Sequence, residues 1–177
     1  MYEWIRKHPA SHLALVTADD RLTWAMLRTE SLQLAQFIHE QTPTAKRIGI
    51  FAKNSKDYVI AVHAVHLLGK VLVPLNTRLT EEEVRTQLQT AKVNLLLVDA
   101  EIDLSVTQLL ITDRATSCFN APHEWKEDET MSLMFTSGTT GRAKAVQQTY
   151  GNHLASARAA EAHLDYRPSD RMLAVTP

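Results

Sequence analysis

Three short apolar runs constrain the fold most. They cover residues 47–52, 71–75 and 93–98, and the stretches between them, 55–68 and 80–91, have helical patterns. Short apolar strands that alternate with helices are typical of a parallel sheet covered by helices. We therefore predict an α/β fold, a layered parallel-sheet domain with flanking helices. Sheets of this kind bind ligands beyond the carboxyl ends of their strands.

Local signals set the bounds of the two helices between these runs. Ser55 is a helix N-cap residue, and the helix that it begins runs through Leu68 to a left-handed stop at Gly69. Thr80 and Glu83 have the spacing of a capping box, which begins a helix that ends near residue 91.

The remaining elements are expected from weaker patterns. Helices are predicted at 2–7, at 24–41 after an N-cap at Thr23, and from Thr149 or Asn152 to about His163; strands are predicted at 12–17, 21–22, 109–112, 131–135, around Val146 and at 171–175.

The most chemically concentrated stretch follows the strand predicted at 131–135. Glycines permit positive φ and close approach of backbone N–H groups to a ligand, hydroxyls add donors, and a lysine adds a point charge suited to phosphate. We therefore predict a clamp for a polyphosphate, formed by Thr136, Ser137, Gly138, Thr139, Thr140, Gly141 and Lys144.

This loop has two other interpretations. It has the composition of an ordinary polar turn between strands, and this alternative stays open. A Walker A loop is excluded by the spacing: Gly138 and Gly141 are three apart, Lys144 follows no glycine, and Ala145 stands where Ser or Thr is required.

The segment from Phe135 to Val146 resembles the phosphate-binding motif of adenylate-forming enzymes, the acyl-CoA synthetase and luciferase superfamily. That motif reads aromatic-T-S-G-T-T-G-x-P-K-G-V, and this chain has Ala143 for the proline and Ala145 for the second glycine. Neither change removes a donor or a charge, and Ala145 requires an ordinary β conformation at the loop exit. The segments 76–79 and 148–153 are similar to those of o-succinylbenzoate–CoA ligases of menaquinone biosynthesis.

The resemblance implies an ATP-dependent carboxylate–CoA ligase, with ATP, Mg²⁺ and coenzyme A as cofactors and a small carboxylate as substrate. The loop residues would hold the β- and γ-phosphates, and no catalytic acid or base is assigned. Arg78 and His153 are candidate substrate contacts. We favour a structural role for Arg78, and a packing role at the start of a helix stays equally open for His153.

Members of this superfamily are longer and contain further adenine, magnesium, ribose and catalytic lysine elements. We therefore expect residues 1–177 to be a partial N-terminal AMP-binding domain without its C-terminal domain, and inactive alone. Within it we predict a first α/β portion at 1–122, a linker at 123–130, and the phosphate-loop strand, loop and following helix at 131–177. A non-catalytic truncated module that acts through a protein partner is the alternative.

Charge, cysteine content and hydrophobic runs argue against several other classes of function. The net charge of −1 gives no electrostatic case for nucleic acid or an anionic membrane. One cysteine, no signal peptide and no transmembrane run indicate a cytoplasmic protein. His63 and His66 lie one helical turn apart, but without a third ligand nearby we predict no metal site.

Overall fold

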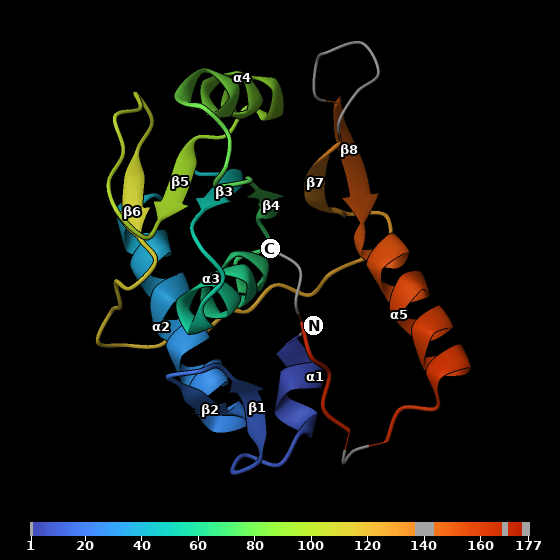
Figure 1. Ribbon diagram of the computed structural model, residues 1–177. Helices are drawn as coiled ribbons and strands as arrows, with labels where there is room; N and C mark the ends of the chain where they lie inside the picture. Colours follow the sequence, from blue (N-terminus) through green and yellow to red (C-terminus); the bar gives the residue numbers. More distant parts are fainter. Residues whose placement is uncertain (1, 137–143, 168–169, 175–177) are drawn as a thin grey trace.

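The computed structural model describes residues 2–136, 144–167 and 170–174, which form two sheets and five helices (Figure 1). The elements in chain order are α1 (Tyr2–Lys7), β1 (Leu13–Val16), β2 (Arg21–Thr23), α2 (Trp24–Gln41), β3 (Arg47–Phe51), α3 (Lys56–Leu67), β4 (Val71–Pro74), α4 (Glu81–Ala91), β5 (Leu95–Val98), β6 (Gln108–Leu110), β7 (Thr130–Thr136), β8 (Lys144–Thr149) and α5 (Tyr150–Leu164).

The central sheet has the strand order β6-β5-β3-β4-β7-β8. Every neighbouring pair from β6 to β7 is parallel, and β7 pairs with β8 in antiparallel fashion. The strands β1 and β2 form a separate antiparallel hairpin. The predicted layered α/β fold with a mainly parallel sheet is therefore confirmed.

Helices cover both faces of this sheet, as Figure 1 shows. Along β5, Leu95 and Leu97 pack with α2 and α3 on one face, whereas Leu96 and Val98 pack with α4 on the other. This two-sided burial explains why the strand has no polar position. On β3, a Cβ at Gly49 would lie 2.7 Å from Leu96 Cδ1, so the sheet has no room for a side chain there.

The predicted helix ends are confirmed at atomic detail. Ser55 Oγ accepts from the backbone N–H of Tyr58 at 3.1 Å, and Thr80 and Glu83 form both hydrogen bonds of the capping box. Gly69 has a φ of +65° just after α3, the left-handed conformation expected there. Thr149 is the N-cap of α5, which settles the choice between Thr149 and Asn152.

The charged segment that leads into β7 is attached to α3. Trp125 Nε1–H donates to the carbonyl of His66 at 3.0 Å, and His123 Nε2 lies 2.9 Å from Glu129 Oε2. The ring of His123 also occupies the space beside Gly69, where a Cβ would meet it at 2.5 Å. This segment therefore holds the amino-terminal end of β7 against the parallel sheet.

The strand predicted at 171–175 is wrong for residues 171–174, which form no strand, and Val175 lies outside the described residues. The reason is the lack of a partner. Met172 and Leu173 are 77% and 84% exposed, so their apolar character reflects no packing within the described chain. The strand predicted at 109–112 is β6, one residue earlier at its start and two at its end.

Candidate functional site

The carboxyl ends of β3, β4 and β7 meet at one edge of the sheet, because these strands are parallel neighbours. The chain leaves β3 for α3 and leaves β4 for α4, and these two helices cover opposite faces. In open α/β sheets, the strand ends at which neighbouring connections leave for opposite faces are the usual place for a ligand. The candidate site lies at this edge.

The antiparallel hairpin of β7 and β8 contributes the mouth of the predicted clamp. Thr136 ends β7, Lys144 begins β8, and the two are direct cross-strand partners. The structure thus brings together the first and last predicted clamp residues. Ser137, Gly138, Thr139, Thr140 and Gly141 lie outside the described residues. Ala145 lies within β8, as the sequence analysis required of the loop exit.

Directly opposed residues of an antiparallel pair share one face of the sheet. Thr136 and Lys144 therefore share a face with two further pairs, Met134 with Val146 and Ser132 with Gln148. Met134 and Val146 are 40% and 44% exposed, whereas Ser132 is only 2% exposed. This face runs from a cationic and hydroxyl-bearing mouth, across an exposed apolar pair, to a buried polar base.

His153 belongs to that polar base. Its Nε2 lies 2.9 Å from Ser132 Oγ, and Ser132 Oγ also donates to Gln148 Oε1 at 3.4 Å. Partial burial lowers the pKa of His153, which favours the neutral ring. Ser132 lies four residues, or about 13 Å of strand, from Thr136. His153 thus joins the first turn of α5 to β7 at the end of the hairpin away from the loop.

Sequence reasoning missed Ser132 and Gln148. The sequence does contain a signal for this pair. Residues at equal distances from the two ends of a hairpin loop lie opposite each other, and Ser132 and Gln148 are each four residues from the loop ends at Thr136 and Lys144.

Arg78 lies in the turn after β4, at the same sheet edge as Thr136. Leu72 and Ser132 are paired on the parallel strands β4 and β7. Four residues further along each strand direction lie Asn76 and Thr136, which are therefore at the same edge of the sheet. The backbone N–H of Arg78 donates to Asn76 Oδ1 at 2.9 Å, a turn closed by the asparagine side chain. Arg78 itself is exposed. Its placement suits a contact to an anionic ligand at the edge.

His63 and His66 lie within the layer formed by α3. His63 Nδ1 and His66 Nε2 are buried without a hydrogen-bond partner, and burial lowers the pKa of these histidines to about 4 and about 3. Nowhere in the described part of the chain do three or more His, Cys, Asp or Glu side chains gather as a metal site. The lowered pKa values make both rings neutral near pH 7; His66 is a buried group and His63 a partly buried one.

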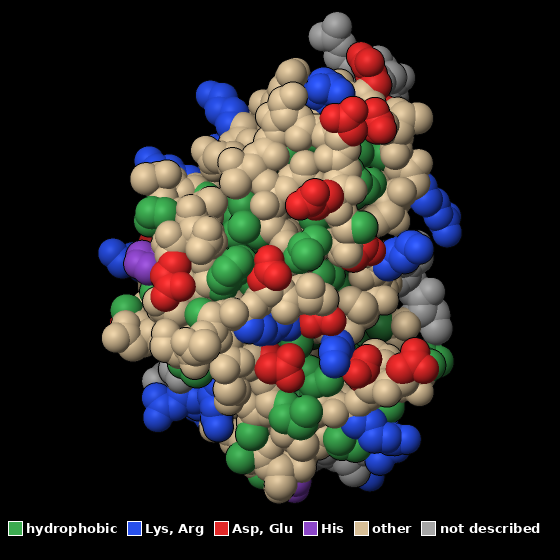
Figure 2. Space-filling view, turned by 90° about the vertical axis from the view of Figure 1, so that its left-hand side faces the viewer, with side chains coloured by type: hydrophobic (Ala, Val, Ile, Leu, Met, Phe, Trp, Pro, Cys, Tyr) green, Lys and Arg blue, Asp and Glu red, His purple; other side chains and the backbone are tan. Residues whose placement is uncertain are grey.

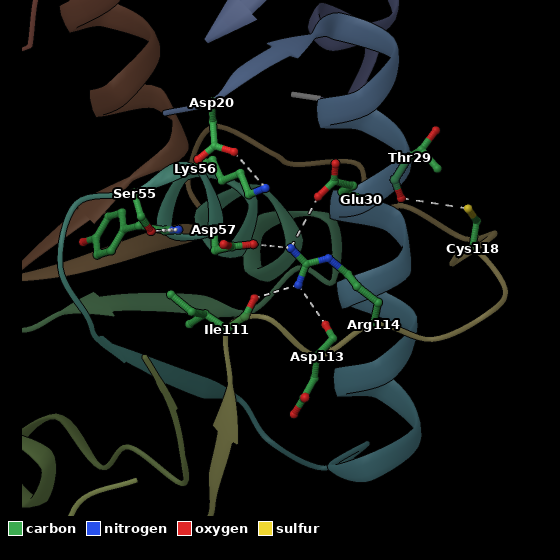
Figure 3. A network of polar contacts seen from close by, with 11 residues as sticks. Asp20, Thr29, Glu30, Ser55, Lys56, Asp57, Ile111, Asp113, Arg114 and Cys118 are labelled. Carbon is green, nitrogen blue, oxygen red and sulfur yellow. Dashed lines mark hydrogen bonds and ion pairs between the residues drawn. The ribbon is translucent and has the colours of Figure 1, made fainter. Parts of the chain in front are cut away.

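A second polar cluster, centred on Arg114, ties the loop after β6 to α2 and α3 (Figure 3). One terminal nitrogen, NH2, lies 2.7 Å from Asp57 Oδ1 and 3.6 Å from Glu30 Oε2. The other, NH1, donates to the carbonyls of Ile111 and Asp113 at 2.6 and 2.8 Å. This guanidinium supports the fold beneath the sheet, and sequence reasoning did not find it.

The one face of the molecule seen in the space-filling view (Figure 2) gives little information on the class of ligand. On the face shown in Figure 2, acidic and basic side chains are interspersed rather than gathered by sign. None of the described helices is long and apolar enough to cross a membrane.

Comparison with known proteins places these features in a family. The family model described as AMP-binding enzyme matches residues 1–177. A 2-succinylbenzoate–CoA ligase from Bacillus mycoides is 30% identical over 171 residues, 93% of this chain and 35% of that protein. The corresponding ligase from Staphylococcus epidermidis is 31% identical over 180 residues, 98% of this chain and 38% of that protein.

A solved structure matches the fold closely. The O-succinylbenzoate coenzyme A synthetase of Bacillus subtilis, in complex with ATP and magnesium ion, superposes with a TM-score of 0.87 at 30% identity, over 99% of this chain and 50% of that one. The chain spans little more than a third of the length of the curated relatives named above. On the match along its whole length, the chain belongs to the family of AMP-binding enzymes.

Proposed function

We propose that residues 1–177 form the polyphosphate-binding part of an ATP-dependent ligase that joins o-succinylbenzoate to coenzyme A. The observation that carries this proposal is the cross-strand pair of Thr136 and Lys144, which closes a loop of glycines and hydroxyls at the carboxyl edge of the sheet. The names of the relatives and the ATP–magnesium complex of the B. subtilis enzyme support the choice of reaction.

The donor set fits a chain of phosphates. The ammonium of Lys144 and the hydroxyl of Thr136 belong to one face of the hairpin at the loop mouth, and phosphate oxygens accept hydrogen bonds from both kinds of group. The B. subtilis relative was solved in complex with ATP and magnesium ion, so we propose that Mg²⁺ accompanies the nucleotide here. Bound in this way, Mg²⁺ neutralises part of the phosphate charge.

In the proposed reaction a substrate carboxylate attacks the α-phosphate of ATP, which gives an acyl-adenylate and pyrophosphate. The thiol of coenzyme A then attacks the acyl carbon and releases AMP. Thr136, the hydroxyls and backbone of 137–141, and Lys144 would hold the β- and γ-phosphates that leave. Their contribution is positioning and electrostatic stabilisation.

We extend the proposal to the second carboxylate of the substrate and to the organisation of the chain. Arg78 is a candidate partner for that carboxylate, because a guanidinium matches a carboxylate with two parallel hydrogen bonds. His153 would contact the substrate only after its Nε2 gives up the hydrogen bond with Ser132 Oγ. We assign residues 1–122 to the first α/β portion, 123–130 to the connection and 131–177 to the phosphate-binding portion, and we place the complete enzyme in the cytoplasm.

Replacing Lys144 with Ala is expected to weaken binding of magnesium–ATP and of magnesium–tripolyphosphate alike. A hydrogen bond to a charged group contributes on the order of 1.5–3 kcal/mol, so the dissociation constants should rise roughly tenfold or more. Isothermal titration with each ligand measures the effect. Lys7→Ala, at an exposed position on α1, is the matched control. Unchanged affinity in Lys144→Ala would rule out the clamp.

The substrate is tested with a chimera in which residues 1–177 replace the matching part of the B. subtilis enzyme. We expect kcat/KM for o-succinylbenzoate to exceed that for benzoate, 4-hydroxybenzoate, acetate and medium-chain fatty acids. Arg78→Ala should raise KM for o-succinylbenzoate and leave benzoate turnover unchanged, because benzoate has no second carboxylate. A preference for any monocarboxylate would overturn the substrate and leave the clamp intact.

A further inference from the structure

We propose that the cavity between α4 and the connection from β5 to β6 binds a small dicarboxylate whose charged ends are separated by an apolar body. The cavity has a volume of about 210 Å³. It is lined by the second half of α4, by the residues that follow this helix and by the end of the β5–β6 connection. None of its lining residues belongs to the proposed clamp.

The cavity lies at the amino-terminal edge of the parallel sheet, opposite the candidate functional site. Lys92 and Val93 lie just before β5, and Val106 lies two residues before β6. The amino ends of β5 and β6 meet at one edge because these strands are parallel neighbours. The helix α4 leads from the carboxyl edge to this edge over 11 residues, about 16 Å. The cavity is therefore separate from the clamp.

The floor of the cavity is apolar. Its side chains belong to the hydrophobic cluster on the α4 face of the sheet: Leu88, Val93, Leu104 and Val106. Leu88 and Leu104 are only 7% and 8% exposed. Small-molecule sites combine an apolar lining of this kind with a few polar groups that orient the ligand. The floor therefore favours a ligand with an apolar body over a hydrated inorganic ion.

Two exposed cations border this floor. Arg85 lies on α4 and Lys92 is the C-cap of the same helix, so they are two turns apart, about 10 Å along the axis. No Asp or Glu lines the cavity, and neither cation takes part in an ion pair within the described part of the chain. A ligand with a carboxylate at each end matches both cations.

Further cations add to the positive charge at this edge. Lys46 and Arg47 stand at the start of β3, and Lys70 directly precedes β4. Burial and the nearby charge of Lys46 lower the pKa of Lys70, so the two ammonium groups lie close to each other. Positive charge gathered in this way raises the local concentration of anions.

The end of α4 does not oppose an anion in the usual way. The last carbonyls of a helix carry partial negative charge, which disfavours anions. Here the carbonyl of Ala91 accepts from Arg47 Nη1 at 2.7 Å. The carbonyls of Leu88 and Gln89 accept from the two backbone N–H groups that follow the helix, at 2.9 and 3.1 Å. The guanidinium of Arg47 therefore offsets the negative end of the helix beside the cavity.

The wall opposite α4 is held in shape without a ligand. Gln108 Oε1 accepts from the backbone N–H of Ile102 at 3.1 Å. Gln108 Nε2 donates to the carbonyls of Ile102 and Leu104 at 2.8 and 3.3 Å. A preformed wall lowers the entropy that a ligand must overcome on binding.

The volume limits the ligand to a small molecule. At roughly 30 Å³ per water in the liquid, the cavity corresponds to about seven water molecules. The linear dicarboxylate suberate is a suitable probe, because a short methylene chain separates its two carboxylates. Octanoate has the same chain with one carboxylate, and 1,8-octanediol has it with none.

The test is a titration of this chain with each probe, followed through the leucine and valine methyl signals in ¹H–¹³C NMR spectra. We expect suberate to shift the signals of Leu88, Leu104 and Val106 most. Octanoate should bind about threefold more weakly than suberate, and the diol about tenfold more weakly, because exposed ion pairs make a small but measurable contribution. Equal affinity for the diol and suberate would overturn the proposal.

Charge variants identify the cations. Lys92→Gln and Arg85→Gln should each raise the dissociation constant for suberate about threefold and leave that for the diol unchanged. Lys46→Gln is the matched control, because Lys46 is an exposed cation at the same edge that does not line the cavity. A loss in Lys46→Gln as large as that in Lys92→Gln would show a general response to charge and contradict a defined site.

A further pair of variants separates this cavity from the candidate functional site. Arg78→Ala and Lys144→Ala should leave the affinity for suberate unchanged. A loss of suberate binding in either variant, with methyl shifts at Val146 instead of Leu88, would place the ligand at the other edge of the sheet and overturn the proposal. Failure of magnesium–ATP to bind would count against the clamp alone, because no clamp residue lines this cavity.

Discussion

The free energy of unfolding is expected to fall steeply as the pH drops from about 6.5 to about 4. The folded state holds the pKa of His63 near 4 and that of His66 near 3, and the ordinary value is 6.5. The unfolded chain therefore binds two more protons than the folded chain in this window, and each costs about 1.4 kcal/mol per pH unit. The loss, on the order of 5 kcal/mol, is comparable with the whole stability of many domains.

The surroundings of His66 strengthen this effect. Burial is the main cause of the lowered pKa of His66, and the nearby His63 and His153 lower it further. The Trp125 ring meets the His66 ring edge-on at a centroid distance of 6.1 Å. Partial burial of His153 adds a smaller contribution in the same direction. Below about pH 4.5, protonation of Glu129 adds a further loss, because the Lys126 N–H and His123 lower its pKa in the folded state.

Urea unfolding between pH 7 and pH 4.5 measures the slope. His63→Leu and His66→Leu should each lower the slope of the unfolding free energy against pH by the amount that corresponds to about one proton. Both changes also remove a ring nitrogen that has no hydrogen-bond partner. His163→Gln, at an exposed position of α5, is the control. A slope in the two leucine variants equal to that of the parent chain would contradict the assignment.

Arg114→Ala is expected to destabilise the fold by about 3 kcal/mol. The change leaves two carboxylates without their cation, Asp57 and Glu30, whose side chains are 18% and 29% exposed. Removing one member of a buried charge pair costs about 3–5 kcal/mol, and the lower end applies because these groups are partly exposed. The carbonyls of Ile111 and Asp113 also lose their donors.

Denaturant unfolding at pH 7 measures this loss. Arg114→Lys should recover part of it, since lysine restores the charge but not the planar fork that serves two carbonyls and a carboxylate at once. Arg85→Ala, at an exposed position on α4, should change stability by less than about 0.5 kcal/mol. A loss in Arg114→Ala as small as that of Arg85→Ala would show that the cluster is replaced by water at little cost.

The parallel core was predictable because its signals are local. The apolar runs that became β3, β4 and β5 are buried on both faces, so no alternation was needed to recognise them. Ser55, Thr80 and Gly69 mark helix ends through bonds that span only a few residues. The hydroxyls and glycines after Thr136 were likewise recognisable as one stretch of sequence.

Contacts between distant segments were not predictable in this way. Arg114 meets Asp57 across 57 positions, and Ser132 meets His153 across 21, and neither contact has a periodic pattern in the sequence. The strand predicted at 171–175 failed for a related reason: an apolar run is a strand only where a neighbour pairs with it. A hydrophobic pattern in the sequence indicates which residues are buried. It does not indicate which residues pack against them, because the fold determines those contacts.

The pairing of β4 with β7 also leads to an expectation for the order in which this molecule gains and loses its structure. The ladder contains one registered pair, Leu72 with Ser132, and the chain makes α4, β5 and β6 between the two strands. Closing so long a connection is entropically costly, so the hairpin is expected to dock last and to open first, as a cooperative unit with α5. A ligand that contacts both Thr136 on the hairpin and Arg78 after β4 would suppress that opening in proportion to the logarithm of its concentration. Binding of such a ligand would then stabilise the docked, fully folded state of the hairpin that binds it.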